Sequence, residues 1–417
     1  MLRSRALSII AAGALCLGLA SCSSEPMPVP SSSPSRTAAP SGDGTLRIGT
    51  LFPTTGATAF IAKAQDAGVE LAIREINEAG GVNGTPVEVF HRDSGDASTD
   101  TAEQSLADLL EKKVDVVIGP SSSILAERLL PTIVDARVTM ISPSATDPGL
   151  STLNDNGYLF RTIPSAALQG SALAEIAGKG KKVAIVYFSD ATGKAVLASL
   201  TDGLVAVTGE LVASERFTDT TNDADKIISV LTKAKPDVVV LVSPFSAMTK
   251  NKAIITALAK AGLAASKLWL TSQNLADYSQ ALPTGTLKDA NGILEGASPD
   301  EAFTKRVKSA DPSVSDFRYA TEAYDATILA ALAAIVAGND SGDAVAATLR
   351  NVSSGGIKCT SFGECLDVLK TQDDIDYDGI SGPLALDAAG DPHPAHYGLY
   401  TYDAENKFKR TGDATAG

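Results

Sequence analysis

The chain has 417 residues, a formal net charge of -14, and a composition that is 44% hydrophobic but only 5% aromatic. This acidic balance argues against a nucleic-acid partner, because phosphate neutralisation requires a basic face that the sequence lacks. The length exceeds what one hydrophobic core normally serves, so we expect two domains in the folded body.

The N-terminus has the pattern of an export signal. Arg3 and Arg5 precede an apolar stretch, residues 6–20, that is shorter than the roughly 20 residues of a membrane span. The stretch ends in Leu-Ala-Ser-Cys, the pattern at which a lipoprotein signal is cut so that the thiol of Cys22 can carry lipid. An ordinary buried helix is the alternative. We predict a lipoprotein signal peptide over 1–21 and an exported protein, lipid-anchored to the outer face of the cytoplasmic membrane, at the cell surface or on the periplasmic side.

Residues 22–44 consist mostly of Ser, Pro, Ala and Gly. This composition cannot bury enough apolar surface to fold, so it predicts a flexible tether. The folded body is expected to begin near Thr45.

From residue 46 onward, short β-rich runs alternate with segments of helical spacing. This alternation is typical of parallel βαβ units and predicts a doubly wound sheet. The first helix is expected from Gly56 to Glu78, ending before Gly80 and Gly81, because glycine readily takes the left-handed conformation that ends a helix. The expected strands are residues 46–51, 87–91, 114–119 and 138–142.

A second series of the same kind follows. It predicts another lobe of the same construction, so the expected fold is α/β with two Rossmann-like doubly wound lobes. The expected strands are residues 182–188, 210–217, 237–243 and 267–271, and the expected helices are residues 192–207, 224–233 and 248–261.

Past residue 296 the pattern changes to longer helical segments and returns to strands at the end. This order indicates a chain that crosses between the lobes three times, near 161–165, 291–296 and 380–383, and these crossings would form a three-strand hinge. The expected helices are about 298–309, 315–338 and 343–350, and the expected strands are 382–387 and 395–402. The lobes would comprise 45–163 with about 297–380, and 164–296 with about 381–410.

Cys359 and Cys365 lie close together in the sequence. In an exported protein such a pair predicts a local disulfide that pins a surface loop. A metal site is the alternative, but it would need further Cys or His ligands, which the local sequence lacks. We expect no metal and no cofactor.

Two strand ends in lobe one are rich in hydroxyl groups. Ser121, Ser122 and Ser123 follow the strand 114–119, and residues 142–146 bring further Ser and Thr to the next loop. Ligands of open parallel sheets bind beyond the carboxyl ends of the strands, where helix N-termini suit a carboxylate. Capping of the helices is the alternative role for these side chains. Two adjacent strand ends with the same chemistry favour a binding site.

Several segments between about residue 46 and residue 402 resemble a known family, in the same order along the chain. They are Ile48-Gly49-Thr50 leading to Gly56, the run from Ile76 to Gly84, the run from Val117 to Ser123, the run from Met140 to Thr146, and Arg161-Thr162 with Gln169-Gly170. The family is that of the leucine/isoleucine/valine-binding proteins, the type I periplasmic solute-binding proteins of ABC importers. The resemblance implies two lobes, joined by three strands, that close around an amino acid.

The resemblance also implies roles for individual residues. Ser123 and Thr146 would hold the ligand carboxylate, and the Ser144 backbone would help with the amino group. The residues placed along the ligand side chain are Phe60 or Ile61 from lobe one and Phe245 from lobe two.

Three positions depart from the family pattern. Ala166 and Gln273 stand where acids receive the ligand ammonium, and Thr192 replaces a tyrosine of lobe two that faces the ligand. A desolvated ammonium needs a carboxylate partner, so the ligand need not be a standard amino acid. Asp190 could supply the missing charge or be a solvated loop acid, and Tyr324 could face the cleft or pack in the core.

An enzyme is the first rival to a binding function. Only His91, His393 and His396 could serve as general bases near neutral pH, and the sequence has no nucleophile elbow, zincin helix or phosphate loop. We therefore expect no enzyme, but an extracytoplasmic solute-binding lipoprotein of an ABC importer that captures a branched-chain or hydrophobic amino acid, or a related small carboxylate, by lobe closure. Its partners would be that small molecule, the permease subunits, and the membrane through the lipid anchor. The alternatives are a ligand-sensing receptor for a signalling protein, and the same importer role with an amide or aromatic-acid ligand.

Overall fold

The computed structural model describes residues 42–416, with gaps at 57, 221–223 and 297–298. The expected signal peptide, the lipidated Cys22 and all of the tether before residue 42 lie outside the described residues.

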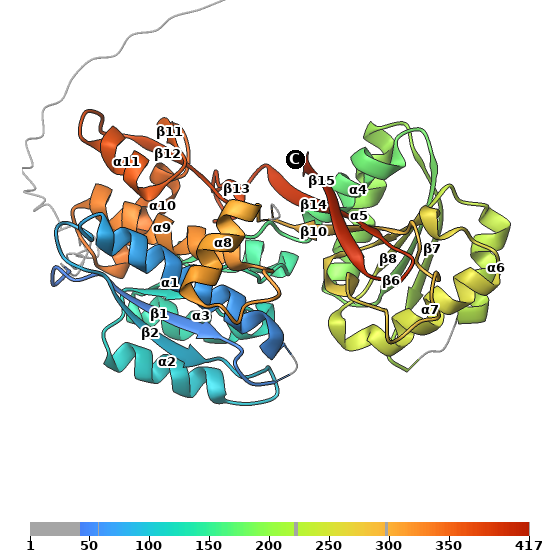
Figure 1. Ribbon diagram of the computed structural model, residues 1–417, viewed down its shortest axis with the longest axis horizontal. Coiled ribbons are helices and arrows are strands. Elements are labelled where there is room, and N and C mark those ends of the chain that lie inside the picture. Colours follow the sequence, from blue (N-terminus) through green and yellow to red (C-terminus); the bar gives the residue numbers. More distant parts are fainter. Residues whose placement is uncertain (1–41, 57, 221–223, 297–298, 417) are drawn as a thin grey trace, which may run out of the picture. The chain divides into compact units, whose positions relative to one another are not determined.

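The first sheet is parallel throughout and has the strand order β2-β1-β3-β4-β5, of which β1 and β2 are labelled in Figure 1. Its inner strands read as nearly continuous apolar runs because both faces of the sheet are covered. In β1, alternate residues face opposite sides, so Ile48 and Phe52 join one core cluster while Leu51 joins the other. The strands are β1 Arg47–Phe52, β2 Glu88–Asp93, β3 Val116–Ile118, β4 Thr139–Ser142 and β5 Leu159–Arg161.

Helices cover both faces of this sheet. The core cluster of Ile48 and Phe52 includes α1 and α9, whereas that of Leu51 includes α2 and α3. Gly68 lets α1 approach α9 closely, because a Cβ at this position would lie 2.3 Å from the Ala320 carbonyl oxygen. The helices are α1 Ala62–Glu78, α2 Thr101–Glu111, α3 Ser123–Ala136, α8 Glu301–Ala310, α9 Ala320–Ala337 and α10 Gly342–Val352.

The first helix of this lobe is shorter than predicted, and α9 is unusually apolar. The first helix begins at Ala62 rather than Gly56, because a separate 3-10 turn, Ala59–Ile61, precedes it. Among the described residues, α9 alone is long and apolar enough to cross a membrane, but 83% of its apolar window is buried inside the protein. Because its side chains fill the core between α1 and α10, it is the central helix of the first lobe.

The second sheet repeats the order of the first. Its parallel part runs β7-β6-β8-β9-β10, and the antiparallel strands β14 and β15 extend it beyond β10. The predicted fold of two doubly wound lobes is therefore confirmed. The strands are β6 Lys182–Phe188, β7 Glu210–Phe217, β8 Val238–Val242, β9 Leu268–Leu270, β10 Asn291–Glu295, β14 Ala395–Tyr402 and β15 Phe408–Ala416, and the helices are α4 Ala167–Leu173, α5 Ala191–Ala206, α6 Ala224–Ala234 and α7 Met248–Lys260.

A small sheet follows α10 on lobe one, and most of it was not predicted from the sequence. It consists of β11 Ile357–Cys359, β12 Ile375–Gly379 and β13 Gly382–Pro383, with α11 Phe362–Leu369 between the first two strands. The strand expected over 382–387 has only its first two residues, and beyond them Leu386 forms only an isolated bridge with Pro392.

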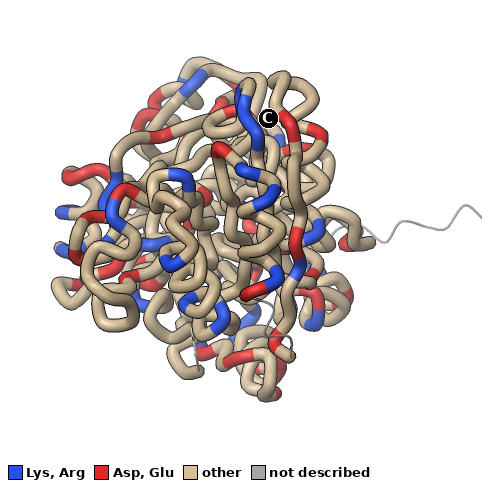
Figure 2. The backbone as a smooth tube through the Cα atoms, turned by 90° about the vertical axis from the view of Figure 1, so that its right-hand side faces the viewer, with Lys and Arg blue, Asp and Glu red and all other residues tan. Residues whose placement is uncertain are grey.

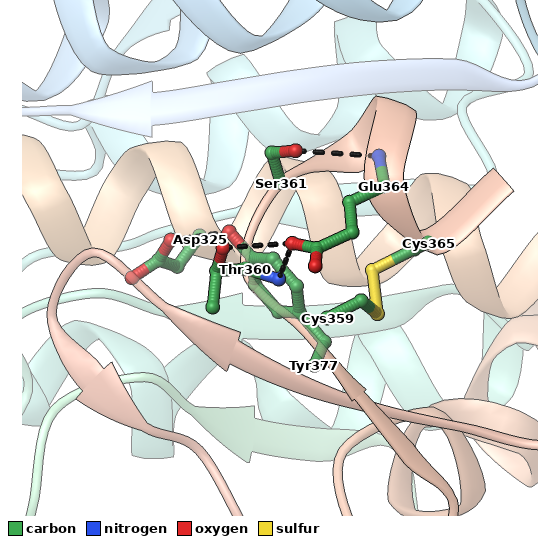
Figure 3. The surroundings of a disulfide bond; sticks show 7 residues. All are labelled: Asp325, Cys359, Thr360, Ser361, Glu364, Cys365 and Tyr377. Atoms are coloured by element: carbon green, nitrogen blue, oxygen red, sulfur yellow. Dashed lines mark hydrogen bonds between the residues drawn. A yellow bond between two sulfur atoms is a disulfide. The ribbon is translucent and has the colours of Figure 1, made fainter. Parts of the chain in front are cut away.

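A disulfide and a buried carboxylate fasten this small sheet (Figure 3). Cys359 on β11 is bonded to Cys365 on α11, the pairing that the sequence predicts. Asp325, fully buried on α9, accepts hydrogen bonds from the Tyr377 hydroxyl at 2.7 Å, from the Ser381 N–H at 2.7 Å and from the Ser381 hydroxyl at 2.6 Å. These donors compensate the cost of burying the charge, so β12 is held against α9.

Three segments connect the lobes. The first follows β5 and the second follows β10. The third leads into β14: Leu386 still packs in the core of lobe one, whereas Ala395 packs in lobe two. These contacts favour a third crossing between those two residues rather than at 380–383. Arg161, 1% exposed, forms an ion pair with Asp391 at 2.5 Å and so joins the first connection to the third.

Candidate ligand-binding site

An open cavity of about 410 Å³ lies where the carboxyl ends of both sheets present their loops. Lobe one contributes the loops after β1, β2, β3 and β4, and lobe two contributes those after β6, β8 and β9. In an order such as β2-β1-β3, the connections leave β1 and β3 in opposite directions, which opens a crevice at the strand ends. Each sheet has such a crevice, and both open into this cavity.

The cavity gathers nearly all the residues named as ligand contacts from the sequence. Phe60 is the exception: it is 44% exposed and contacts Phe245 at the rim. Contact of any of these residues with a ligand stays a prediction. The predicted residues that line the cavity are Ile61, Ser122, Ser123, Ser144, Thr146, Thr192, Phe245 and Gln273.

One of the serines after β3 caps the following helix, as considered from the sequence, and ligand binding by these serines stays a prediction. Ser122 is the N-cap of α3, and its Oγ accepts a hydrogen bond from the Leu125 N–H at 3.5 Å. Ser123 begins the helix, and its Oγ accepts from the Asp147 N–H at 3.1 Å, so its hydroxyl proton is left for a ligand. Capping and ligand binding therefore do not exclude each other here.

Thr146 differs from these serines because its hydroxyl has no hydrogen-bond partner among the described residues. The residue is only 5% exposed, and it lines the cavity. The Thr146 hydroxyl is not among the fully buried unpaired polar atoms, so it is accessible to pair with a ligand or a bound water.

A glutamine that sequence reasoning missed holds the two hydroxyl-rich loops together. Gln65, fully buried on α1, donates from Nε2 to Ser144 Oγ at 2.8 Å and accepts from the Ser121 hydroxyl at 2.6 Å. Neither residue type nor spacing marks Gln65, because its partners lie far away along the chain.

Lobe two contributes residues from the first helical turns that follow its strands. Thr192 lies in the first turn of α5, and Phe245 begins the 3-10 turn after β8. Gln273 lies in the 3-10 turn Ser272–Asn274, which a capping box between Thr271 and Asn274 stabilises.

Two aromatic residues of the late helices have different places. Tyr319, not predicted from the sequence, lines the cavity in a left-handed conformation with φ 63°. Burial raises the pKa of Tyr319, and the nearby Glu295 carboxyl raises it further, so the phenol stays protonated. Tyr324 packs in the core instead, with its ring centroid 5.4 Å from that of Phe303 and its hydroxyl donating to Glu75 at 2.7 Å.

The positions that depart from the family pattern differ in accessibility. Ala166 is 1% exposed and uses its backbone N–H to donate to the Thr146 carbonyl at 2.8 Å, and it does not line the cavity. Asp190 does line it, and its Oδ1 accepts from the Gly193 N–H at 2.7 Å as the N-cap of α5. Burial raises the pKa of Asp190 above its usual range.

The described residues contain no group of three or more His, Cys, Asp or Glu arranged to hold a metal. His91, on β2, contacts two acids on α1, with Nε2 2.6 Å from Glu70 Oε1 and Nδ1 3.1 Å from Asp66 Oδ1, and it does not line the cavity. Figure 2 shows Lys and Arg interspersed with Asp and Glu on the face it presents, with no continuous basic stripe.

Two doubly wound lobes with a shared cavity at their strand ends define a binding-protein fold. The chain belongs to the periplasmic binding protein family, whose profile matches residues 45–364.

Individual relatives agree with this assignment. The chain is 25% identical, over 83% of its length and 84% of the relative's, to the chemotactic signal transduction system substrate-binding protein BasB of Halobacterium salinarum. Its fold is similar to that of the branched-chain amino acid transporter substrate-binding protein LivJ of Streptococcus pneumoniae in complex with isoleucine, with a TM-score of 0.65 and 20% identity over 89% of this chain and 100% of the other. It is also similar to a solute-binding protein of an ABC transporter from R. palustris in complex with benzoate, with a TM-score of 0.63 and 19% identity over 90% and 98%.

Proposed function

We propose that this protein is the extracytoplasmic receptor of an ABC importer and captures an amino acid or a related small carboxylate by closure of its two lobes. The observation that carries the proposal is the shared cavity, which Ser123 and Thr146 of lobe one line together with Phe245 and Gln273 of lobe two. The ligand would dock on lobe one first, and lobe two would then close over it. The closed form would be recognised by the permease.

The ligands of two related structures support this choice of ligand. One relative was solved with isoleucine and another with benzoate, and both molecules carry a carboxylate beside an apolar group. The Ser123 and Thr146 hydroxyls suit a carboxylate, and Ile61 and Phe245 suit an apolar group.

A double Ser123→Ala, Thr146→Ala variant tests the site. Removing two hydrogen bonds to a charged group should weaken binding of isoleucine or benzoate, measured by calorimetry, by about 100-fold or more. Loss of Ser122 capping is avoided, because Ser122 is unchanged. Unaltered affinity in a folded variant would refute the site.

A sensor is the second candidate function, because BasB serves chemotactic signalling and matches most of this chain. Lobe closure would serve a signalling partner as well as a permease. Cross-linking of the closed protein in membranes separates the two: recovery of a permease supports transport, whereas recovery of a transducer supports sensing.

The lipid anchor is tested at Cys22, which lies outside the described residues. A Cys22→Ala variant should bind ligand normally but appear in the soluble fraction, because membrane attachment would depend on the lipid. Retention in the membrane fraction would contradict the anchor.

A further inference from the structure

A second cavity, of about 530 Å³, opens beside the connection that follows β10. Lobe one contributes the segment that leads from α8 into α9, and lobe two contributes the end of β10 and parts of β14 and β15. Tyr319 is the only described residue that lines both this cavity and the ligand cavity. This hinge cavity therefore has walls from both lobes and shares one wall residue with the ligand cavity.

Two buried glutamates line the hinge cavity, one from each lobe. Glu295 ends β10 of lobe two, Glu322 lies in the first turn of α9 of lobe one, and each is only 2% exposed. The two are neighbours in space, because a Cβ on Gly296 would lie 1.7 Å from Glu322 Oε1. The Glu322 carboxylate therefore lies against the backbone that directly follows Glu295.

Neither carboxyl has a cationic partner among the described residues. Glu295 Oε1 accepts a hydrogen bond from Gln169 Nε2 at 2.9 Å, whereas its Oε2 has no partner. Glu322 Oε2 accepts from the Thr321 hydroxyl at 2.9 Å. Burial raises the pKa of Glu295 to about 7 and that of Glu322 to about 8, and no Lys or Arg opposes this rise. A cation that entered the cavity would supply the missing attraction.

Three cations line the hinge cavity, and each acts on an acid other than these two glutamates. Hydrogen bonds from Ser279 lower the pKa of Asp277, and the Lys407 charge lowers it further. The ion pairs of the two arginines are Arg318 with Asp316 and Arg410 with Asp413. Glu295 and Glu322 are thus the acids of this cavity whose charge is left without compensation.

Four aromatic side chains also line the hinge cavity. The faces of such rings attract an organic cation, and its carbon chain can pack against them. A bare metal ion fits less well, because the described residues contain no group of three or more His, Cys, Asp or Glu that could hold one. The lining therefore favours a small organic amine. The aromatic residues are Phe317, Tyr319, Tyr400 and Phe408.

We propose that the hinge cavity is an effector site for a small organic cation, which binds between Glu295 and Glu322. The cation would bridge the lobes in the arrangement that completes the ligand cavity, where Phe60 of lobe one contacts Phe245 of lobe two. Occupancy should therefore raise affinity in the ligand cavity, since two sites that favour one conformation reinforce each other. The cation site is independent of the proposed receptor function, and only its effect on ligand affinity rests on that function.

Calorimetry with the diamine putrescine tests the cation site on the wild-type protein. At pH 8.5 both glutamates should be mostly ionised, so the diamine should bind. The matched probe is 1,4-butanediol, which has the same carbon chain without the charges and should bind about tenfold or more weakly. Equal binding of the two probes, or no binding of putrescine, would overturn the cation site.

Substitutions locate the bound diamine. Glu295→Gln and Glu322→Gln keep the shape of each side chain but remove its charge, so each should lower putrescine affinity by about tenfold or more. Glu75→Gln is the matched control, because Glu75 pairs with Arg306 and lines neither cavity. Thermal unfolding shows whether the variants fold. Putrescine affinity within about twofold of wild type in both folded cavity variants would contradict the assignment to these glutamates.

The effect on the ligand cavity is measured separately. Isoleucine and benzoate are titrated into the wild-type protein with and without saturating putrescine, and the affinity for the acid that binds should rise about threefold or more. Unchanged or weaker binding would overturn the effector role but not the cation site. Failure of both acids to bind under either condition would overturn the proposed receptor function, and the effector role with it, while the cation site would stand on the putrescine titrations.

Discussion

Phe60 of lobe one and Phe245 of lobe two meet edge to face, with their ring centroids 5.7 Å apart. The Arg318 guanidinium, paired with Asp316, lies 4.8 Å from the centroid of the Phe60 ring and 5.9 Å from that of the Phe245 ring. A single cation therefore contacts an aromatic ring from each lobe at the rim of the ligand cavity.

Arg318→Met should shift the ligand-free protein toward wider separation of the lobes, because each cation–π contact contributes about 0.5–2 kcal/mol. Spin labels at Glu78→Cys on α1 and Lys260→Cys on α7, both exposed, would report the distance distribution in the Cys22→Ala background. In a Phe245→Leu protein, Arg318→Met should have little further effect, since the contact with lobe two is already lost.

Arg306→Met is the matched control for Arg318. Arg306 lies 5.6 Å from the Phe303 ring centroid and 5.3 Å from that of Tyr324, and it pairs with Glu75, but all these partners belong to lobe one. Its loss should lower stability without changing the distance between the labels. Equal shifts of the label distance in Arg318→Met and Arg306→Met would show that Arg318 does not link the lobes.

Removing the buried ion pair of Arg161 should strongly destabilise the protein. Arg161 bonds to Asp391 with Nε–Oδ1 at 2.6 Å, and its Nη1 donates to the Ala145 and Asp147 carbonyls at 3.1 and 3.0 Å. Arg161→Met leaves Asp391 buried without its partner, so the free energy of unfolding in urea should fall by about 3–5 kcal/mol. Arg410→Met removes an exposed pair with Asp413 and should cost at most about 1 kcal/mol. Similar losses in the two variants would contradict this assignment.

His91 should make stability fall as pH rises from 6.5 to about 9. Burial lowers the pKa of His91, but the hydrogen bonds and charges of Asp66 and Glu70 outweigh it and raise the pKa to about 9. Because the folded pKa exceeds the unfolded value, the contribution is complete below pH 6.5 and is lost through pH 9. The melting temperature of His91→Gln should therefore depend less on pH in this window than that of the wild type. Equal pH dependence of the two melting temperatures would contradict this prediction.

Glu295→Gln should stabilise the protein at pH 8 and have a much smaller effect at pH 5. Burial at the end of β10 raises the pKa of Glu295 to about 7, and its Oε2 has no hydrogen-bond partner among the residues that the structure describes. Ionisation of the folded protein at pH 8 therefore costs free energy that the unfolded chain does not pay, on the order of 1–3 kcal/mol. Thermal unfolding at the two pH values measures the difference. Greater stabilisation at pH 5 would reverse the expected sign.

The lobes could be predicted because their signals are local. Lys182–Phe188 and Glu210–Phe217 have the predicted bounds, since apolar β-rich runs with clear ends mark them. The short strands β11 and β12 were missed. In β12, aspartates alternate with apolar and aromatic residues, and the distant Asp325 holds the strand in place. β15 was missed as well, since Phe408–Ala416 is largely polar and exposed and is held by its pairing with β14.

The candidate site likewise has parts that local sequence signals predict and parts that depend on distant contacts. Strand ends and hydroxyl-rich loops pointed to Ser123 and Thr146, and the family resemblance added Phe245. Gln65, Tyr319 and Arg318 were missed, because each matters through contacts with residues far away in the sequence. Asp147 and Asp190 can be read in the sequence, but only the fold brings them to the same cavity.

The repeated strand order also bears on how such a protein could change its specificity. Each crevice has its own set of loops on its own parallel sheet, and the hydrogen-bonded ladders of one sheet do not depend on the loops of the other. Exchanging the segments after β6, β8 and β9 would thus alter the lobe-two half of the cavity lining and leave intact the half that we propose to bind a carboxylate. New preferences could be acquired stepwise, one half at a time, without rebuilding the scaffold.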